Sequence, residues 1–267
     1  DYTCTPLIVR DDLSVYDELA QVNIQTVINP AAIDNNDSDG SNARTNYYSI
    51  LQYENEEYYW KNCEGEYIYF VNNGGSKYVG SNSSGDNYVL TASGSPTDFN
   101  NISILSEKDN TKYNFSTINS NGYVTKITYV FTDEYKNPYT NEVKIIYSGT
   151  KISHVTDSTN RKYKFNYDGN DMLESVSVHY TVNGTEQPVK INNQEISVQY
   201  DYYENKKLKK VTYPDGYNVV YSYDENNRLS TIKSYELNSD NPTEELNLIY
   251  QESLVQTAVL SSYTLKI

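Results

Sequence analysis

Cysteine, methionine and alanine are scarce in this sequence, and each shortage excludes a class of structure or site. Two cysteines, Cys4 and Cys63, are too few for a disulfide framework or a zinc site, and whether they pair with each other stays open. One methionine and six alanines leave few strong helix formers among 267 residues. No apolar run approaches roughly 18 residues, so we expect no membrane-spanning helix.

Positive charge is also in short supply. The chain has 21 lysines and arginines against 36 aspartates and glutamates, a formal net charge of −15. Because a surface this acidic repels phosphate groups, we expect no nucleic acid as a partner and no membrane insertion. Little cysteine, much tyrosine and asparagine, and high acidity are together typical of a secreted or cell-surface bacterial protein.

Tyrosine and asparagine are abundant instead, with 30 and 33 residues. Tyrosines and β-branched residues alternate over short runs that Asn and Gly interrupt, which predicts short strands joined by turns. No βαβ spacing occurs, so the expected fold class is all-β, with consecutive antiparallel β-hairpins and little helix. The final segment, residues 244–267, fits a helix or a strand, and its alternation favours a strand.

We expect three regions along the chain. Residues 1–46 hold N-terminal strands, one of them near residues 22–28, and a polar loop. Residues 47–121 form a β-hairpin region, in which the segment 57–70 is an aromatic hairpin. Residues 122–267 hold repeated hairpins.

The second half of the chain repeats itself, and this is the strongest pattern in the sequence. Residues 155–168 align with residues 211–224, and 12 positions separate the valine from the Tyr-Asp pair in both copies (167 − 155 and 223 − 211). A leucine and then a β-branched residue follow each pair. A third copy is Tyr200-Asp201 with Leu208. Because one hairpin cannot bury its own face, the copies must stack.

Each position of the repeat has a physical role. The aspartate after the last tyrosine, as in Asp224, can accept hydrogen bonds from turn amides two residues on. Asn160 aligns with Gly216, which predicts a positive φ at that point of the turn. Tyr167 and Tyr223 are predicted to pack between adjacent hairpins. Turns are expected near residues 157–160, 168–171, 202–206, 213–216 and 224–227.

These residues resemble the YD repeat of bacterial RHS proteins. The likeness is carried by Tyr-Asp-Glu-Asn-Asn-Arg-Leu-Ser-Thr-Ile at residues 223–232, preceded by Tyr-Pro-Asp-Gly at residues 213–216, and it extends over about residues 122–235. Insertions near Asn183-Gly184 and at residues 238–243 interrupt the pattern. By this resemblance, the structural residues of the motif are Tyr167, Asp168, Leu173, Tyr200, Asp201, Leu208, Asp215, Gly216, Tyr223, Asp224, Arg228 and Leu229.

The resemblance implies a twisted, open sheet of stacked hairpins, which in this family spirals into a shell around a C-terminal effector. Neither the self-cleavage motif of such shells nor an effector is found in these residues, so the chain resembles the N-terminal part of the repeat region. The implied role is a non-catalytic scaffold or casing, in toxin delivery or at the cell surface. Its implied partners are the remaining repeats or the effector of the same polypeptide.

Two alternative functions remain open. One is a carbohydrate- or cell-surface-binding β module, which would capture a cell-surface glycan through a row of exposed tyrosines. The other, the weaker one, is a glycoside hydrolase, which needs two carboxylates about 5 to 10 Å apart. Glu56-Glu57 and Glu244-Glu245 are adjacent acids, whose side chains point to opposite faces of a strand, so neither is a natural catalytic pair.

Other chemistry-bearing residues favour structural roles, and we expect no enzyme and no cofactor. His154 and His179 lie in strand-like segments without metal-ligand spacing, which favours a polar strand face. Asn35, Asp37 and Asp39 resemble the first half of a calcium loop. The position that should hold a bidentate glutamate is Asn46, however, which favours a solvated acidic loop.

Overall fold

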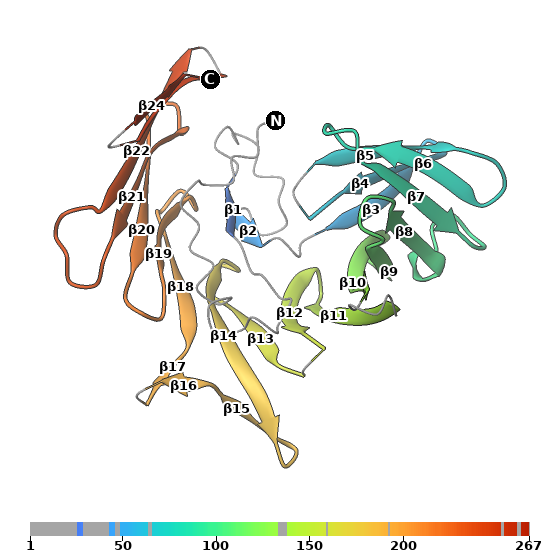
Figure 1. Ribbon diagram of the computed structural model, residues 1–267, viewed down its shortest axis with the longest axis horizontal. Coiled ribbons are helices and arrows are strands. Elements are labelled where there is room, and N and C mark those ends of the chain that lie inside the picture. The colour runs from blue at the N-terminus through green and yellow to red at the C-terminus, as the bar shows by residue number, and fades with distance from the viewer. Residues whose placement is uncertain are drawn as a thin grey trace. The chain divides into compact units, whose positions relative to one another are not determined.

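The computed structural model consists almost entirely of β-strands (Figure 1). The only helical element among the described residues is a single 3-10 turn, η1 (Phe99–Asn101). Within the part of the chain that is described, no helix is long and apolar enough to cross a membrane. The described residues are 26–28, 43–45, 49–63, 66–132, 138–158, 160–191, 193–251, 254–260 and 263–266.

The all-β prediction of consecutive antiparallel hairpins is confirmed. The chain divides into two compact units, whose boundary lies between Tyr163 and Lys164, within β13 (Lys162–Tyr167). A short separate sheet pairs β1 (Thr26–Ile28) with β2 (Ala43–Thr45). Cys4 and the predicted calcium loop of Asn35, Asp37 and Asp39 lie outside the described residues, and the three predicted regions of the chain stay a prediction.

One unit, which includes residues 45–163, is a meander whose sheet closes on itself. Each strand from β3 to β10 pairs with the next, and β10 pairs back with β3 through Gly122 opposite Leu51 and Tyr123 opposite Ile50. An open sheet was predicted, so closure of this unit is a difference from expectation. Its strands are β3 (Ile50–Glu54), β4 (Glu57–Lys61), β5 (Tyr67–Asn72), β6 (Lys77–Ser81), β7 (Asn87–Ala92), β8 (Ile102–Ser106), β9 (Lys112–Ile118), β10 (Asn121–Thr132), β11 (Pro138–Ser148) and β12 (Lys151–Thr156).

Aromatic side chains fill the interior of this closed sheet. Trp60 is 1% exposed, and its indole N–H donates to Ser49 Oγ at 2.7 Å. Its ring centroid lies 4.9 Å from that of Tyr113. Tyr58 is fully buried and donates its hydroxyl hydrogen to Pro96 O at 3.1 Å. Tyrosine serves in this core because its hydroxyl reaches a backbone acceptor while its ring is buried.

The other unit, which includes residues 164–267, stacks the repeat hairpins. Its longest strand, β14, forks: residues 175–177 pair with β18, whereas residues 179–182 pair with β15. The final segment forms strands, as the alternation favoured. The strands of this unit after β13 are β14 (Leu173–Val182), β15 (Thr185–Pro188), β16 (Lys190–Ile191), β17 (Gln194–Glu195), β18 (Ser197–Tyr202), β19 (Leu208–Thr212), β20 (Asn218–Tyr223), β21 (Leu229–Tyr235), β22 (Glu244–Gln251), β23 (Leu254–Leu260) and β24 (Tyr263–Lys266).

Candidate functional site: the turns and junctions of the repeat

One five-residue turn recurs at the predicted positions. In every copy the N–H of the first residue donates to the carbonyl of the fifth, and the N–H of the fourth donates to the carbonyl of the first. The turns begin at Asp157, Asp168, Tyr203, Tyr213 and Asp224. Their fourth residues all have positive φ: Asn160 (63°), Asp171 (67°), Lys206 (64°), Gly216 (85°) and Asn227 (60°). The predicted equivalence of Asn160 and Gly216 is therefore confirmed.

The aspartate that opens a turn binds the backbone of that turn. Asp224 Oδ1 accepts from the N–H groups of Asn226 and Arg228, at 2.9 and 2.8 Å, and Asp224 Oδ2 accepts from Arg228 Nε at 2.8 Å. Partial burial acts to raise the pKa of Asp224, but these hydrogen bonds and the Arg228 charge outweigh it and lower the pKa. Asp168 makes the same two backbone contacts, to Asn170 and Met172, both at 2.8 Å.

Tyrosine hydroxyls join each hairpin to the one before it. Tyr202 donates to Leu173 O at 2.9 Å, Tyr223 to Leu208 O at 2.9 Å, and Tyr250 to Leu229 O at 2.7 Å. Each acceptor is the leucine that follows a turn. These three contacts, which we call the tyrosine rungs, link consecutive hairpins by the same geometry.

Two cations complete the junctions. Lys207 Nζ lies 5.2 Å from the ring centroid of Tyr223, and the guanidinium carbon of Arg228 lies 4.3 Å from that of Tyr250. Both cations are the fifth residue of a turn, so the turn holds the cation against the next tyrosine. Burial lowers the pKa of Lys207. Tyr223 therefore packs on the preceding hairpin as predicted, although its side chain is half-buried, and the fully buried tyrosine of the strand is Tyr221.

The third copy of the repeat is displaced from the predicted pair. Tyr200 is 7% exposed and pairs with Val211, and Asp201 is exposed on β18. Tyr202 and Tyr203 instead take the places of Tyr223 and Asp224, because the turn begins five residues before the leucine. Counting back from Leu208 would have found them in the sequence. Of the remaining motif residues, Leu173, Leu208 and Leu229 are buried, and Tyr167 is half-buried at the end of β13. Asp215 Oδ1 accepts from the Tyr217 N–H at 2.9 Å beside Gly216.

Two grooves lie between consecutive turns of this edge. One, of about 520 Å³, is lined by residues of the turns at Asp168 and Tyr203, and the other, of about 700 Å³, by residues of the turns at Tyr203 and Asp224. Tyr202 and Tyr203 line both. Volumes of this size suit a small molecule, and the lining combines aromatic rings with amides and carboxylates.

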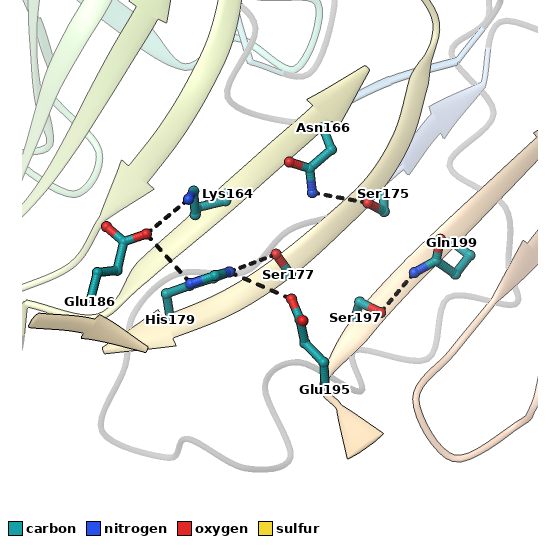
Figure 2. Close-up of polar contacts among 9 residues, drawn as sticks. All are labelled: Lys164, Asn166, Ser175, Ser177, His179, Glu186, Glu195, Ser197 and Gln199. Atoms are coloured by element: carbon teal, nitrogen blue, oxygen red, sulfur yellow. Dashed lines mark hydrogen bonds and ion pairs between the residues drawn. The ribbon is translucent and has the colours of Figure 1, made fainter. Parts of the chain in front are cut away.

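A second polar cluster surrounds His179 (Figure 2). Its Nδ1 lies 3.5 Å from Glu186 Oε1, and its Nε2 lies 3.6 Å from Glu195 Oε1 and 3.0 Å from Ser177 Oγ. Lys164 Nζ lies 2.9 Å from the same Glu186 oxygen. The cluster spans β13, β14, β15 and β17, on the polar face that the sequence predicted for His179.

The His179 cluster lacks the geometry of a metal site or a catalytic triad. Its two carboxylates face opposite ring nitrogens, so they cannot converge on one ion, and no group of three or more metal-ligating residues is found among the described residues. Ser177 has a hydroxyl beside the imidazole, but it is 3% exposed and lines neither groove. A buried serine outside a cleft cannot reach a substrate carbonyl.

The adjacent acids considered for glycoside hydrolysis are not members of these clusters. Glu56 has a positive φ of 68° in the turn before β4, where Glu57 accepts the hydroxyl hydrogen of Tyr59 at 3.0 Å. Glu245 pairs with Lys233 at 3.3 Å, while Glu244 begins β22. None of these four acids lines either groove.

A row of tyrosines is exposed on the outer face of the closed sheet. Tyr67 and Tyr69 on β5 are 50% and 60% exposed, and Tyr59 on β4 stands opposite Tyr69 with ring centroids 5.2 Å apart. Lys61 Nζ lies 5.7 Å from the Tyr67 ring. Val71 continues the same face of β5 at 69% exposure. We call Tyr59, Tyr67 and Tyr69 the outer tyrosine row.

The geometry of the junctions defines a class of protein, a tandem array of antiparallel hairpins joined edge to edge. Within that class, residues 202–235 are similar to an RHS repeat, because the family model described as RHS Repeat matches this stretch. The match begins at Tyr202, the last residue of β18, and runs through β19, β20 and β21, so it contains both partners of one tyrosine rung, Tyr223 and Leu208. No curated protein matches the chain in sequence.

Solved structures similar to the chain include the Tc holotoxin pore of Photorhabdus luminescens, with 14% identity over 82% of this chain and a TM-score of 0.42. The crystal structure of TcdB2-TccC3 has 12% identity over 94% of the chain and a TM-score of 0.41. That of TcdB2-TccC3-Cdc42 has 10% identity over 93% and a TM-score of 0.43. The chain spans only 10 to 13% of the length of the chains it matches in these structures.

Proposed function

We propose that this chain is a non-catalytic structural segment, a scaffold or casing, of a larger secreted bacterial RHS-type protein related to toxin delivery. The observation that carries the proposal is the set of tyrosine rungs, in which the same contact recurs three times and each time joins one hairpin to the next. The hydroxyl and carboxylate contacts of these motif residues go to turn amides and carbonyls of the chain itself, which supports a structural use of the repeat. The partners are the remaining repeats, or the effector, of the same polypeptide.

Two measurements on the full polypeptide test this proposal. A casing should slow proteolysis of the polypeptide that follows this segment, relative to the same following part produced alone. The intact polypeptide should also be recovered from the culture medium or the cell surface. Equal cleavage rates in the two forms, or retention inside the cell, would contradict the proposal.

The non-catalytic part needs its own test. A screen of glycans, esters and peptides with the 267-residue chain should show no turnover. Turnover that disappears when a single carboxylate is replaced, for example by Glu57→Gln or Glu245→Gln, would overturn it.

A carbohydrate- or cell-surface-binding module is a second candidate, favoured by the outer tyrosine row. Exposed tyrosine rings offer apolar faces, and their hydroxyls with the Lys61 ammonium offer polar contacts to a neutral sugar. Tyr67 and Tyr69 are at least half exposed.

Replacement of the outer tyrosines tests this candidate. If the row captures a cell-surface glycan, Tyr67→Ala and Tyr69→Ala should each abolish binding on a glycan array while the melting temperature stays within about 2 °C of the parent. Tyr180→Ala is the matched control, because Tyr180 is 38% exposed on β14 and belongs to the other unit. Binding that survives both row variants would refute the assignment.

A further inference from the structure

The fork of β14 is the point where an insertion interrupts the regular stacking of hairpins. β14 leaves β18 after Ser177 and pairs with β15 from His179 onward. Three backbone hydrogen bonds tie the insertion to this point: Val178 N–H to Ile196 O at 3.2 Å, Val189 N–H to Val178 O at 2.8 Å, and Ile196 N–H to Val189 O at 2.9 Å. Ile196 immediately precedes β18, so the hydrogen bonds of its backbone to Val178 and Val189 help to set the register in which β18 pairs with β14.

His179 is placed between the two arms of this insertion (Figure 2). Glu186 comes from β15, on the outgoing arm, and Glu195 from β17, on the returning arm. Each carboxylate faces a different nitrogen of the ring, at 3.5 and 3.6 Å. The His179 side chain is only 13% exposed, so the contacts are partly shielded from water.

We propose that His179 is an acid-responsive clamp that fastens both arms of the insertion to β14. A neutral imidazole has one N–H, whereas the imidazolium has two, so only the protonated ring can donate to both carboxylates. In the neutral ring, Nδ1–H donates to the Glu186 carboxylate, and Nε2 accepts the hydroxyl hydrogen of Ser177, whose Oγ lies 3.0 Å away. Protonation adds the attraction to Glu195 and thereby fastens the returning arm.

The charges around the ring determine which arm responds. Lys164 on β13 already neutralises Glu186 at 2.9 Å, so the Glu186 contact depends less on the proton. Lys190 on β16 stands opposite Glu195 in the β16–β17 ladder, but the charged group within 4 Å of the Glu195 carboxylate is His179. The Glu195 contact is therefore the part that protonation controls. The clamp is complete in acid, where the ring carries both protons, and the Glu195 contact is lost when the ring releases its second proton.

Amide hydrogen exchange of the whole chain, followed by NMR, tests the clamp. Protection of the Val178, Val189 and Ile196 amides is compared at about pH 5.5 and 8, after correction for the intrinsic exchange rate. Protection should be about two- to fivefold higher at the acid pH, the range for a partly exposed ion pair. His179→Gln and Glu195→Gln should each abolish this difference.

Two matched variants separate the clamp from general acid effects. His154→Gln removes the other histidine of the chain, on β12, and Glu174→Gln removes a carboxylate from the exposed face of β14. Both should keep the parent's pH dependence. The proposal is overturned if the parent shows no difference between the two pH values, or if the difference survives in Glu195→Gln, a variant that leaves His179 in place.

Discussion

At the scale of single residues, the tyrosine that ends β20 and the tyrosine near the end of β22 each combine two contacts with the preceding hairpin. The hydroxyl of Tyr223 reaches Leu208 O at 2.9 Å, and its ring lies 5.2 Å from the Lys207 ammonium. A phenylalanine could make only the ring contact with the lysine ammonium, and a smaller polar residue could make neither contact. The junction therefore uses both the ring and the hydroxyl of tyrosine.

Replacing Tyr223 by phenylalanine and by alanine separates the contribution of its hydroxyl from that of its ring. Tyr223→Phe should lower the free energy of unfolding by about 0.5–1.5 kcal/mol, because Leu208 O loses its donor. Tyr223→Ala should lower it by more than Tyr223→Phe, since the ring contacts are lost as well. Urea unfolding measures both. Tyr180→Phe, which removes an exposed hydroxyl, should change stability by less than about 0.5 kcal/mol, and an equal loss in Tyr223→Phe and Tyr180→Phe would rule out the rung.

Lys206 is an unfavourable residue type for its position in the turn. It adopts φ of 64° at a position that Gly216 and Asn227 fill in other turns. Lysine is strained there, whereas asparagine tolerates this region better. We expect Lys206→Asn to stabilise the chain by about 0.5–1 kcal/mol and the reciprocal Asn227→Lys to destabilise it by a similar amount. Thermal unfolding that shows no opposite shift in this pair would contradict the turn assignment.

The sequence predicted those features that depend on a single residue and its neighbours along the chain. Aligning Asn160 with Gly216 revealed the positive φ, and the aspartate was correctly assigned to the turn amides. The tyrosine rungs could not be predicted, because a hydroxyl that bonds a carbonyl in another hairpin leaves no trace in local spacing. The same holds for His179, whose partners come from β15 and β17, elements that the repeat pattern does not contain.

At the scale of strands, the spacing of apolar residues departs from simple alternation for a structural reason. Leu229 and Ile232 are three residues apart and yet both are buried, as are Leu208 and Val211. The registers show why: Ser222 and Tyr223 pair with Thr231 and Leu229, so Ser230 is an extra residue on β21, and Lys209 is the equivalent extra residue on β19. One extra residue returns the second apolar side chain to the core. A leucine three residues before a β-branched residue therefore indicates a bulge in this repeat.

Closure of the meander depends on one strand position. Gly122 on β10 stands opposite Leu51, and a Cβ atom there would lie 2.6 Å from the Phe99 ring, which is 1% exposed. Neighbouring side chains are packed too closely to give way freely. The sequence could not predict closure, because the pairing of β10 with β3 joins residues about 70 positions apart with no shared motif.

We therefore expect Gly122→Ala to destabilise the closed sheet by about 1–3 kcal/mol, the usual range for overpacking. Gly169→Ala is the matched control, because an added Cβ there meets nothing within 4 Å and the φ of Gly169 is not positive. Gly94 has a positive φ, so an alanine there would be strained for a different reason. Chemical denaturation should show a loss in Gly122→Ala and little change in Gly169→Ala. Equal effects would mean that the Phe99 contact does not limit closure.

At the scale of the whole molecule, the cores are rich in tyrosine, and this gives stability an alkaline limit. Burial, with a smaller contribution from the charge of Asp157, raises the pKa of Tyr163 to about 12 despite the opposing charge of Arg161. Burial also raises the pKa values of Tyr58, Tyr113, Tyr129 and Tyr221. The folded chain keeps these hydroxyls protonated at a pH where the unfolded chain releases their protons.

The sign of the effect follows from linkage. A group whose pKa is raised by folding contributes its full stability below the unfolded value of 10.0, and this contribution is lost as the pH rises through the folded value of about 12. The melting temperature should therefore fall steeply between pH 10 and 12, and Tyr163→Phe should lessen the fall. Calorimetry over this range is the measurement, and a flat profile would contradict the burial of these tyrosines.

The bulges described for the strands have a consequence for how such a chain grows. Each bulge increases the right-handed twist locally and bends the strand that contains it. Because the β18–β19, β20–β21 and β22–β23 hairpins carry the register shift at the same place, we expect their bends to have the same sense and to add. Each repeat then adds the same amount of curvature. We therefore expect the residue spacing within one repeat to determine the radius of a longer array, and the number of repeats to determine only its arc length.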